Sequence, residues 1–530
     1  MRPSAVVALS LALPVLAAAQ AKPACDLSPN FFRLNSAPLN LHLAEEKPDQ
    51  RDRMLAGVKD VAERTLAEHQ DNAVAWYYLA RYYQESHNPW GADTAFAHTE
   101  KLVPQCADTL VQFRKSAWND AFTAGMTAWQ GGKTDSAVIL LQLSRRLMPR
   151  NPRADFQLGQ LYAGANSTDS AITYLNLGAQ LAGTDTAYGD ARHDALGTAA
   201  RLALARAQGD PVIARSMQVR QSLDSLGRYL QNDSILLAHR LAQSASRHSR
   251  GARLSPTDQQ AFATDSTQLS QSLSNDRALR TSLLARAAGD TTALKAAYAP
   301  AVTAYQALLA AYPASLDAAV NLAAIFSQSG HPEMAATALD PVVAHPDLID
   351  QNAALEAAQR MGSGGLGAAA LKLYGMLLKA NPNNRGALAG QADALLRMHD
   401  AGAVAPALKV MALDPSNQLA TRALGQAYGV AGQADSAKKY LARADTGLAV
   451  DISVTQFQPD SAGADLSGVA SNLKGAPSAP LHLTIDFLNA AGAVVTTQTT
   501  QVAPIAPQGS AQFEVKATGK GIVAWRYKLS

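Results

Sequence analysis

The chain has 530 residues, of which 48% are hydrophobic and 17% charged, so it can bury sizeable cores and is not a disordered tail. Its 46 basic and 43 acidic residues give a net charge of +3, and the basic residues are dispersed, which excludes nucleic acid and an anionic membrane surface as expected partners. At roughly 100–200 residues a domain, the length predicts three or four domains.

Residues 1–21 have the pattern of a secretory signal peptide. Arg2 supplies a positive start, an apolar run follows from Val6 to Leu16, and two small-x-small cleavage sites end at Ala19 and Ala21. The run is too short to cross a bilayer of about 30 Å, and no later stretch is long enough to do so. We therefore expect an exported protein, periplasmic or at the cell surface, with no transmembrane segment. A buried N-terminal helix is the alternative.

The only two cysteines are Cys25 and Cys106. A lipoprotein site is not predicted at Cys25, because Lys22 stands where a lipobox has an aliphatic residue. Two cysteines in an oxidising compartment can pair. Such a bond would tie an N-terminal arm, residues 22–65, to the first repeat. Two free thiols are the alternative, and the sequence leaves both open.

A repeat then runs along the chain. Gly125 matches Gly159 at an offset of 34, and the tetrad beginning at Thr134 is identical to the one beginning at Thr168. In each tetrad an Asp and a Ser can cap a helix start, and the alanine that follows lets a neighbouring helix come close. The same spacing continues downstream at Ala335, Ala370, Ala403 and Ala437. Units close at Pro104, Pro149, Pro382 and Pro415, where a helix cannot continue.

One unit resembles a complete tetratricopeptide repeat, through Trp76, Leu79, Ala80, Tyr83, Ala92, Phe96 and Pro104. Other units are weaker versions, with Gly183 in place of a closing proline and Gln391 near a usual small residue. The resemblance implies a mainly α chain, an α-α superhelical solenoid, with one array over 66–211 and a second over 289–447. We expect residues 185–211 to be a further degenerate helix pair.

Between the arrays the period changes. Apolar residues at steps of three and four form a heptad-like seam: Val219, Leu223, Leu226, Leu230, Leu237 and Leu241. After a polar loop from Ser244 to Ser255, Pro256 starts a second long helix marked by Phe262, Leu269, Leu273, Leu279 and Leu283. This predicts an antiparallel helical hairpin over 212–288, which projects from the solenoid or bridges its halves. Two extended repeats packed in line are the alternative.

After Gly447 the apolar period becomes two. Leu481, Leu483, Ile485 and Phe487 alternate with polar residues, and Val523, Trp525 and Tyr527 do the same. Six or seven short strands predict a small antiparallel β-sandwich over 448–530. Asn472, the run from Ile485 to Gly492, and Phe513 resemble the FxLYD-type, immunoglobulin-like module of bacterial extracytoplasmic proteins.

No pattern indicates catalysis. Gly132-Lys133-Thr134 lacks the leading glycine of a phosphate-binding loop, since Thr127 stands there, and Ser471 and Lys474 fall in a predicted β-region loop. The histidines and carboxylates show no metal-binding spacing. We therefore expect no catalytic, cofactor-binding or metal residues and no enzyme activity.

By resemblance, the first helix of each repeat lines a concave groove. The residues expected there are Tyr77, Arg81, Phe122, Met126, Phe156, Gln160, Asn321, Arg422 and Gln426. Aromatic residues, Met and Arg are common interface anchors, although Phe122 and Phe156 in particular can instead pack between repeats. A lysine–asparagine clamp for acidic chaperone tails is absent, because Tyr77, Arg81 and Thr123 hold the matching positions.

The sequence thus predicts an exported, non-catalytic bacterial scaffold that binds a protein partner in this groove, with the hairpin serving homo-oligomerisation or spacing. In the alternative, the β-sandwich binds an envelope component or surface polymer, and the solenoid is a stalk.

Overall fold

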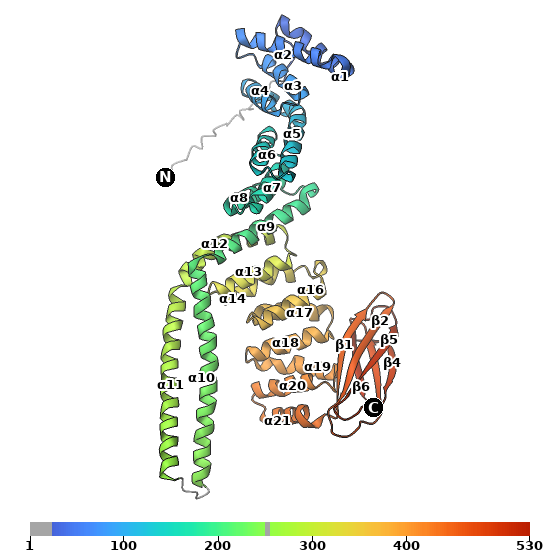
Figure 1. The fold of residues 1–530 in the computed structure, drawn as a ribbon. Coiled ribbons are helices and arrows are strands. Elements are labelled where there is room, and N and C mark those ends of the chain that lie inside the picture. Colours follow the sequence, from blue (N-terminus) through green and yellow to red (C-terminus); the bar gives the residue numbers. More distant parts are fainter. Residues whose placement is uncertain (1–23, 250–254, 530) are drawn as a thin grey trace, which may run out of the picture. The chain divides into compact units, whose positions relative to one another are not determined.

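The computed structural model describes residues 24–249 and 255–529 (Figure 1). The predicted signal peptide, residues 1–21, lies outside the described residues. The chain forms two compact units that meet within helix α9 (Gly189–Gln208), one ending at Ala195 and the other beginning at Leu196.

The first unit is helical. Its elements are η1 (Phe32–Ser36), α1 (Ala37–Glu46), η2 (Pro48–Gln50), α2 (Arg51–Glu68), α3 (Ala73–Glu85), α4 (Pro89–Leu102), η3 (Pro104–Cys106), α5 (Ala107–Gln130), α6 (Thr134–Leu147), α7 (Arg153–Gly164), α8 (Thr168–Ala182) and η4 (Thr186–Tyr188). Consecutive helices pack as the pairs α3–α4, α5–α6 and α7–α8. The identical tetrads predicted as helix starts begin α6 and α8.

Glycines explain how closely the paired helices approach. A Cβ added at Gly159 on α7 would lie 2.5 Å from Cγ of Leu175 on α8, and one added at Gly125 would lie 3.0 Å from Cγ of Leu141. Both distances are shorter than ordinary van der Waals contact. The repeated glycine at an offset of 34 therefore marks the closest approach within each pair.

The segment predicted as an N-terminal arm contains α1 and α2. Leu34, Leu41 and Val58 are buried in one core with residues of α3, α4 and α5. Cys25 and Cys106 form a disulfide whose Cα atoms are 4.8 Å apart. The bond connects the start of the described chain to η3, directly before α5.

The second unit contains the remaining helices. They are α10 (Pro211–Ser249), α11 (Pro256–Gly289), α12 (Thr291–Ala311), α13 (Leu316–Gln328), α14 (Pro332–Ala335), η5 (Thr337–Leu339), α15 (Asp340–Val343), η6 (Pro346–Leu348), α16 (Gln351–Ser363), α17 (Gly367–Ala380), α18 (Arg385–Arg397), η7 (Ala401–Ala403), α19 (Val404–Leu413), α20 (Gln418–Val430), α21 (Ala434–Ala442) and η8 (Arg443–Gly447). The four alanines predicted in phase are all buried and lie at the starts of second helices.

The long helices α10 and α11 pack against each other as a hairpin (Figure 1). Val219, Leu226 and Leu283 are buried in the seam, whereas Leu241 and Leu279 are about half exposed. The expectation of a helix pair over 185–211 is wrong. The structure has the single long helix α9 there, because no proline interrupts the chain between Tyr188 and Pro211.

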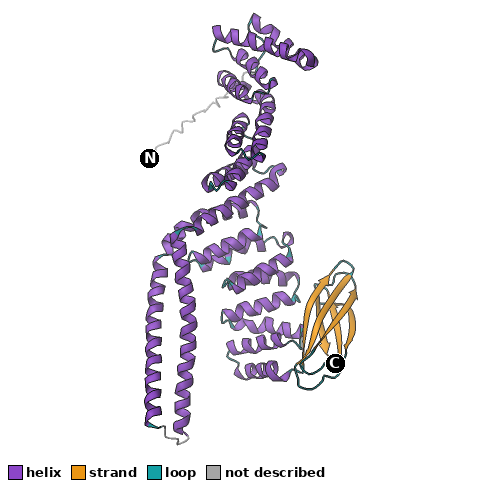
Figure 2. Ribbon diagram, in the orientation of Figure 1, coloured by secondary structure: helices purple, strands orange, loops and turns teal. Residues whose placement is uncertain are grey.

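The C-terminal region is a β-sandwich, the part drawn in orange in Figure 2. Its strands are β1 (Val450–Pro459), β2 (Gly463–Asn472), β3 (Leu481–Leu488), β4 (Val494–Val502), β5 (Ser510–Thr518) and β6 (Ala524–Leu529). They form two antiparallel sheets with strand orders β1-β2-β5 and β4-β3-β6. Alternate residues such as Leu483, Ile485 and Phe487 point into the shared core, which explains the period of two.

The fold class is as predicted: an α-α solenoid in two arrays with a long helical hairpin, followed by a small antiparallel sandwich. The exact domain limits given above remain predictions.

Candidate partner-binding surfaces and the solenoid–sandwich junction

The predicted groove residues on α3 are largely covered. Tyr77 is 8% exposed, and its Oη accepts a hydrogen bond from Nη1 of Arg81 at 3.3 Å. The Arg81 guanidinium lies 4.3 Å from the centre of the Phe113 ring on α5 and 3.9 Å from Glu85. Arg81 therefore joins two neighbouring first helices, and little of it is available to a partner.

The other predicted residues of the first unit differ in exposure. Phe122 stacks on Trp118 with ring centres 5.0 Å apart, and Met126 is half-buried against a core that includes Leu141 and Leu158. Phe156 is buried, and its ring is the close neighbour of Gly178. Gln160 is exposed. Phe156 therefore packs between helices, as the alternative in the sequence analysis expected, whereas Gln160 is open to solvent.

In the second unit, the predicted residues lie on α13 and α20. The Asn321 amide donates to the Asp317 carbonyl at 2.9 Å, and Arg422 forms an ion pair with Asp445 at 2.8 Å. Gln426 is exposed. Of the nine predicted residues, six therefore lie in the first unit and three in the second.

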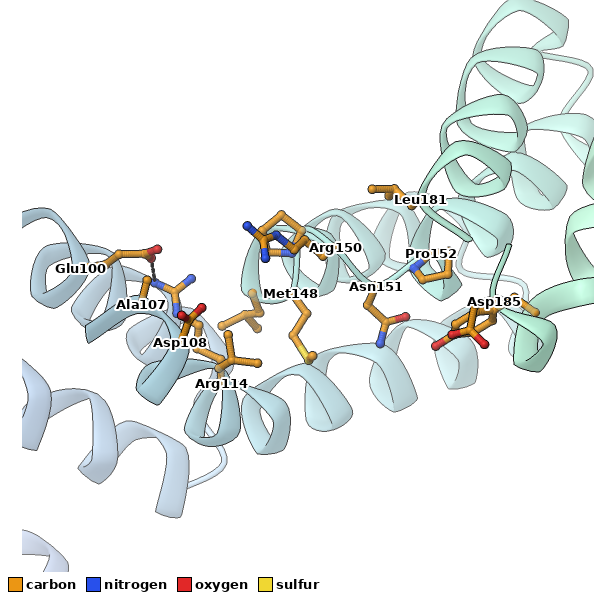
Figure 3. A pocket seen from close by; sticks show the side chains of 14 residues that line it. Glu100, Ala107, Asp108, Arg114, Met148, Arg150, Asn151, Pro152, Leu181 and Asp185 are labelled. Atoms are coloured by element: carbon orange, nitrogen blue, oxygen red, sulfur yellow. Dashed lines mark hydrogen bonds and ion pairs between the residues drawn. The ribbon is translucent and has the colours of Figure 1, made fainter. Parts of the chain in front are cut away.

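A groove of about 680 Å³ lies in the first unit, across the turns that join its helix pairs (Figure 3). Its walls come from the end of α4, the first turns of α5, the turn between α6 and α7, and the segment from the end of α8 to η4. The lining residues are Glu100, Ala107, Asp108, Val111, Arg114, Leu147, Met148, Pro149, Arg150, Asn151, Pro152, Leu181, Asp185 and Tyr188. We call this the turn groove. None of the nine predicted residues lines it.

The turn groove combines apolar surface with charge. Val111 is 47% exposed, and Met148 and Leu181 are half-buried. The buried Arg114 forms an ion pair with Glu100 at 2.6 Å, so its charge is balanced within the wall. Arg150 is exposed and has no partner among the described residues. An apolar floor beside a free guanidinium suits a protein segment that carries apolar and acidic side chains.

Sequence reasoning missed this groove because it missed the first half of α5. The helix has 24 residues, and its repeat-like part begins only near Trp118. The preceding turns, which carry Asp108, Val111 and Arg114, have no counterpart in the other repeats. Pro104 followed by Asp108 and Leu110 was the available indication of an earlier helix start.

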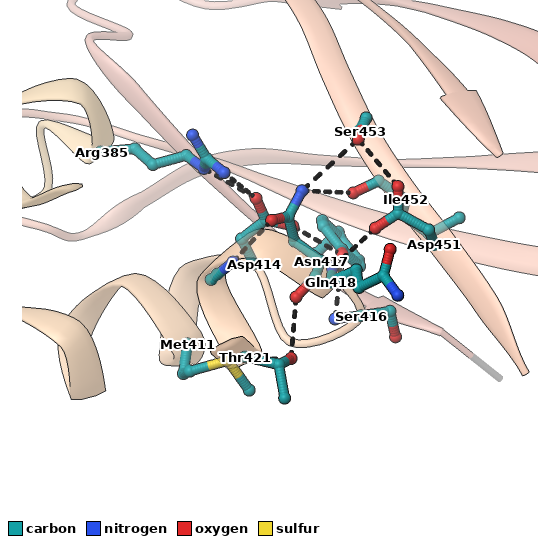
Figure 4. A network of polar contacts seen from close by, with 12 residues as sticks. Arg385, Met411, Asp414, Ser416, Asn417, Gln418, Thr421, Asp451, Ile452 and Ser453 are labelled. Carbon is teal, nitrogen blue, oxygen red and sulfur yellow. Dashed lines mark hydrogen bonds and ion pairs between the residues drawn. The ribbon is translucent and has the colours of Figure 1, made fainter. Parts of the chain in front are cut away.

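In the second unit, a polar network joins the solenoid to the sandwich (Figure 4). Tyr527 on β6 donates to Oδ1 of Asp414 at 2.7 Å, and its Oη accepts from the Ser416 N–H at 3.0 Å. Arg385 forms an ion pair with Oδ2 of Asp414 at 2.6 Å. The Asn417 amide donates to the Ile452 carbonyl on β1 at 3.1 Å. Turns of the second array therefore satisfy backbone and side-chain groups at the sandwich edge.

Burial dominates the electrostatics of this network. Asp414 is fully buried, and burial raises the pKa of its carboxyl, although Arg385 and Tyr527 act in the opposite direction. Burial and the neighbouring Asp414 also raise the pKa of the Tyr527 hydroxyl. An apolar core completes the junction, because Leu488 and Ala524 of the sandwich pack with Leu388 and Leu424 of the array. The two parts share one interior.

Within the part of the chain that the structure describes, no helix combines the length and apolar character needed to cross a membrane. Among the same residues, no group of three or more His, Cys, Asp and Glu is arranged to hold a metal ion.

No protein-family model matches the chain, and no curated protein matches it. Solved structures with similar folds include MamA, 24% identical over 29% of this chain and 91% of that one, with a TM-score of 0.19. The P58(IPK) TPR domain is 12% identical over 75% of this chain and 98% of that one, with a TM-score of 0.16. Naa15/Naa10 bound to HypK-THB is 14% identical over 78% of this chain and 63% of that one, with a TM-score of 0.18.

All three TM-scores are below 0.5, so these likenesses support no function for this chain. The fold follows from the chain's own elements, which make it an α-α solenoid of stacked helix pairs with a C-terminal β-sandwich.

Proposed function

We propose that this protein is an exported, non-catalytic scaffold that binds a partner protein along its first helical array. The observation that carries the proposal is the turn groove, which extends across three helix pairs and presents Val111, Met148 and Leu181 beside Arg150, a side chain with no partner among the residues that the structure describes.

The first-helix residues predicted from the sequence belong to the same proposal in a modified form. Gln160 and the exposed part of Met126 can contact a partner directly. Tyr77, Arg81 and Phe156 support that surface from beneath, since their side chains are mainly occupied by intramolecular contacts. Variants at these buried positions would mix effects on binding with effects on folding.

Export to an oxidising compartment is the second part of the proposal. The predicted signal peptide and the Cys25–Cys106 disulfide support it together, because such bonds persist mainly outside the reducing cytosol. N-terminal sequencing of the native protein tests it. The expected new terminus follows Ala19 or Ala21, and a native protein that retains Met1 or Arg2 contradicts it.

The hairpin is proposed to join two copies of the chain. Tyr229, Ile235 and Leu236 are 64%, 60% and 46% exposed on α10, which leaves apolar surface that a second hairpin can cover. Light scattering of the wild type is expected to give twice the mass of one chain, and Ile235→Glu/Leu236→Glu to give one. A wild-type monomer removes this part of the proposal.

In the rival proposal, the sandwich is the ligand-binding domain, an FxLYD-like module that binds a surface polymer. Because Leu488 and Ala524 share a core with the second array, isolated fragments would expose it. The two functions are therefore distinguished with point variants of the whole chain. The scaffold proposal is tested by affinity capture of partner proteins with the variant Arg150→Glu/Val111→Asp, which changes two residues of the turn groove. The control is Arg153→Glu/Ile139→Asp, which makes the same kinds of change at exposed residues outside the turn groove.

A further inference from the structure

A second hollow, of about 450 Å³, lies in the other unit between the second array and the sandwich. One wall is the start of α16 with the turn between α17 and α18, and the other is the second half of β1 with the start of β6. We call it the junction crevice. It is separate from the turn groove and has no part in the scaffold function, but its walls include strands of the sandwich, so it bears on the rival function.

The walls of the junction crevice are held at a fixed spacing. The Asn381 amide donates to the Val523 carbonyl at 2.9 Å, directly at the crevice. Behind it, the bonds from Tyr527 to Asp414 and from Asn417 to Ile452 fix β6 and β1 to the array. The site is therefore formed before a ligand binds, and binding does not have to include the entropic cost of ordering it.

The polar lining consists mainly of uncharged amides. Two asparagines have structural roles, since Asn381 binds Val523 and Asn384 caps α18 by accepting from the Ala387 N–H. Four further side-chain amides have no hydrogen-bond partner among the described residues: Gln351, Asn352, Asn383 and Gln456. The one charged lining residue, Arg385, is neutralised by its ion pair with Asp414. The crevice thus offers donors and acceptors without a free charge.

Apolar surface lies beside these amides. Phe457 and Leu355 are half-buried in the lining, and Val523 is 37% exposed. A sugar ring has the complementary chemistry, because each hydroxyl can both donate and accept while the C–H faces are apolar. We propose that the junction crevice binds an uncharged oligosaccharide, with Asn352 and Gln456 bonding its hydroxyls from opposite walls and Phe457 contacting a ring face.

The geometry of β1 argues against an extended peptide in this place. β1 is an edge strand, and a peptide would gain most of its affinity by pairing with the edge backbone. However, the strand has a bulge between Val454 and Gln456, and Pro459 has no N–H to donate. Both features disfavour strand addition along the stretch that lines the crevice.

The test uses the full-length mature chain and four neutral probes: maltohexaose, cellohexaose, mannohexaose and chitohexaose. Binding is measured by titration calorimetry and by saturation-transfer NMR. The variant is Asn352→Ala/Gln456→Ala. Its matched control is Gln359→Ala/Gln458→Ala, which removes exposed amides from the same helix and strand but outside the crevice. Melting temperatures of all forms are compared first.

At least one probe is expected to bind the wild type and the control equally, and to bind the variant about tenfold or more weakly, since two hydrogen bonds are lost. The variant should still capture the protein partner of the turn groove, so the two proposals fail independently. The inference is overturned if none of the four probes binds, if the variant binds as well as the control, or if uncharged peptides bind the crevice and the sugars do not.

Discussion

The Tyr527 hydroxyl donates a hydrogen bond to the fully buried carboxylate of Asp414 across a separation of 113 residues. The bond joins the last strand of the sandwich to the turn between α19 and α20. Because the half-buried Ser416 N–H also donates to this hydroxyl, one side chain forms hydrogen bonds with two polar groups of the array. The sandwich is therefore an integral end of the second array.

We predict that Tyr527→Phe destabilises the second unit by about 2–4 kcal/mol, because Asp414 and the Ser416 N–H each lose a buried partner. Denaturant unfolding followed by tryptophan fluorescence measures the loss, since Trp525 lies two residues away. Tyr229→Phe is the control, because that side chain is 64% exposed and should change stability by less than about 0.5 kcal/mol. Equal midpoints for the two variants would show that the junction contributes nothing.

A pH dependence is expected at Asp486 on β3. Burial acts to raise the pKa of its carboxyl, but the Thr497 hydroxyl at 2.8 Å and Arg526 at 2.9 Å outweigh this and leave the pKa lowered. Because the pKa of the carboxyl is lower in the folded state than in the unfolded state, its ionisation stabilises the fold at pH values above the unfolded-state pKa. This contribution is lost as the pH falls through the folded-state pKa. Wild type should exceed Asp486→Asn in stability by up to about 1 kcal/mol at neutral pH.

The difference in unfolding midpoint between wild type and Asp486→Asn, measured from neutral to acidic pH, checks this sign. It should shrink towards low pH. A difference that stays constant would assign the effect of the substitution to packing rather than to charge.

Local patterns predicted the repeats well, for a physical reason. Ala370 and Ala437 lie where two helices approach closely. Because a small residue is needed at that point in every pair, small residues recur in the sequence at a regular spacing. No regular spacing in the sequence predicts the pairing of Asp414 with Tyr527. Nothing in the neighbourhood of either residue specifies which turn meets which strand.

The predicted groove residues on α3 show that helical periodicity does not predict the exposure of a side chain. Helical periodicity places Tyr77 and Arg81 on one face of α3, but it does not show which neighbours cover that face. Phe113, on the part of α5 without a repeat counterpart, contacts both residues. Periodicity therefore gives the direction of a side chain, while its exposure depends on segments outside the pattern.

Within the first unit, Gly159→Ala is expected to destabilise by about 1–3 kcal/mol, because the added Cβ would lie 2.5 Å from Cγ of Leu175. Gly164→Ala on the same helix is the matched control. A Cβ there has no neighbour within 4 Å, so the substitution should be neutral or slightly stabilising. Thermal melting by circular dichroism compares the two. Similar melting temperatures would contradict the close helix approach.

The disulfide offers a redox test of the same unit. Cys25 and Cys106 are separated by 81 residues, and loss of the bond should cost about 2–4 kcal/mol through the wider freedom of the unfolded chain. Melting with and without reductant measures it. Cys25→Ser/Cys106→Ser should match the reduced wild type and no longer respond to reductant, and a wild type insensitive to reductant would argue against a stabilising role.

The most direct test of the central claim is crosslinking and affinity capture from envelope fractions of the source cells, with three forms of the chain side by side. We predict that wild type and Arg153→Glu/Ile139→Asp recover the same partner protein, and that Arg150→Glu/Val111→Asp loses it while melting at the same temperature. Recovery of that partner by all three forms would contradict binding in the turn groove.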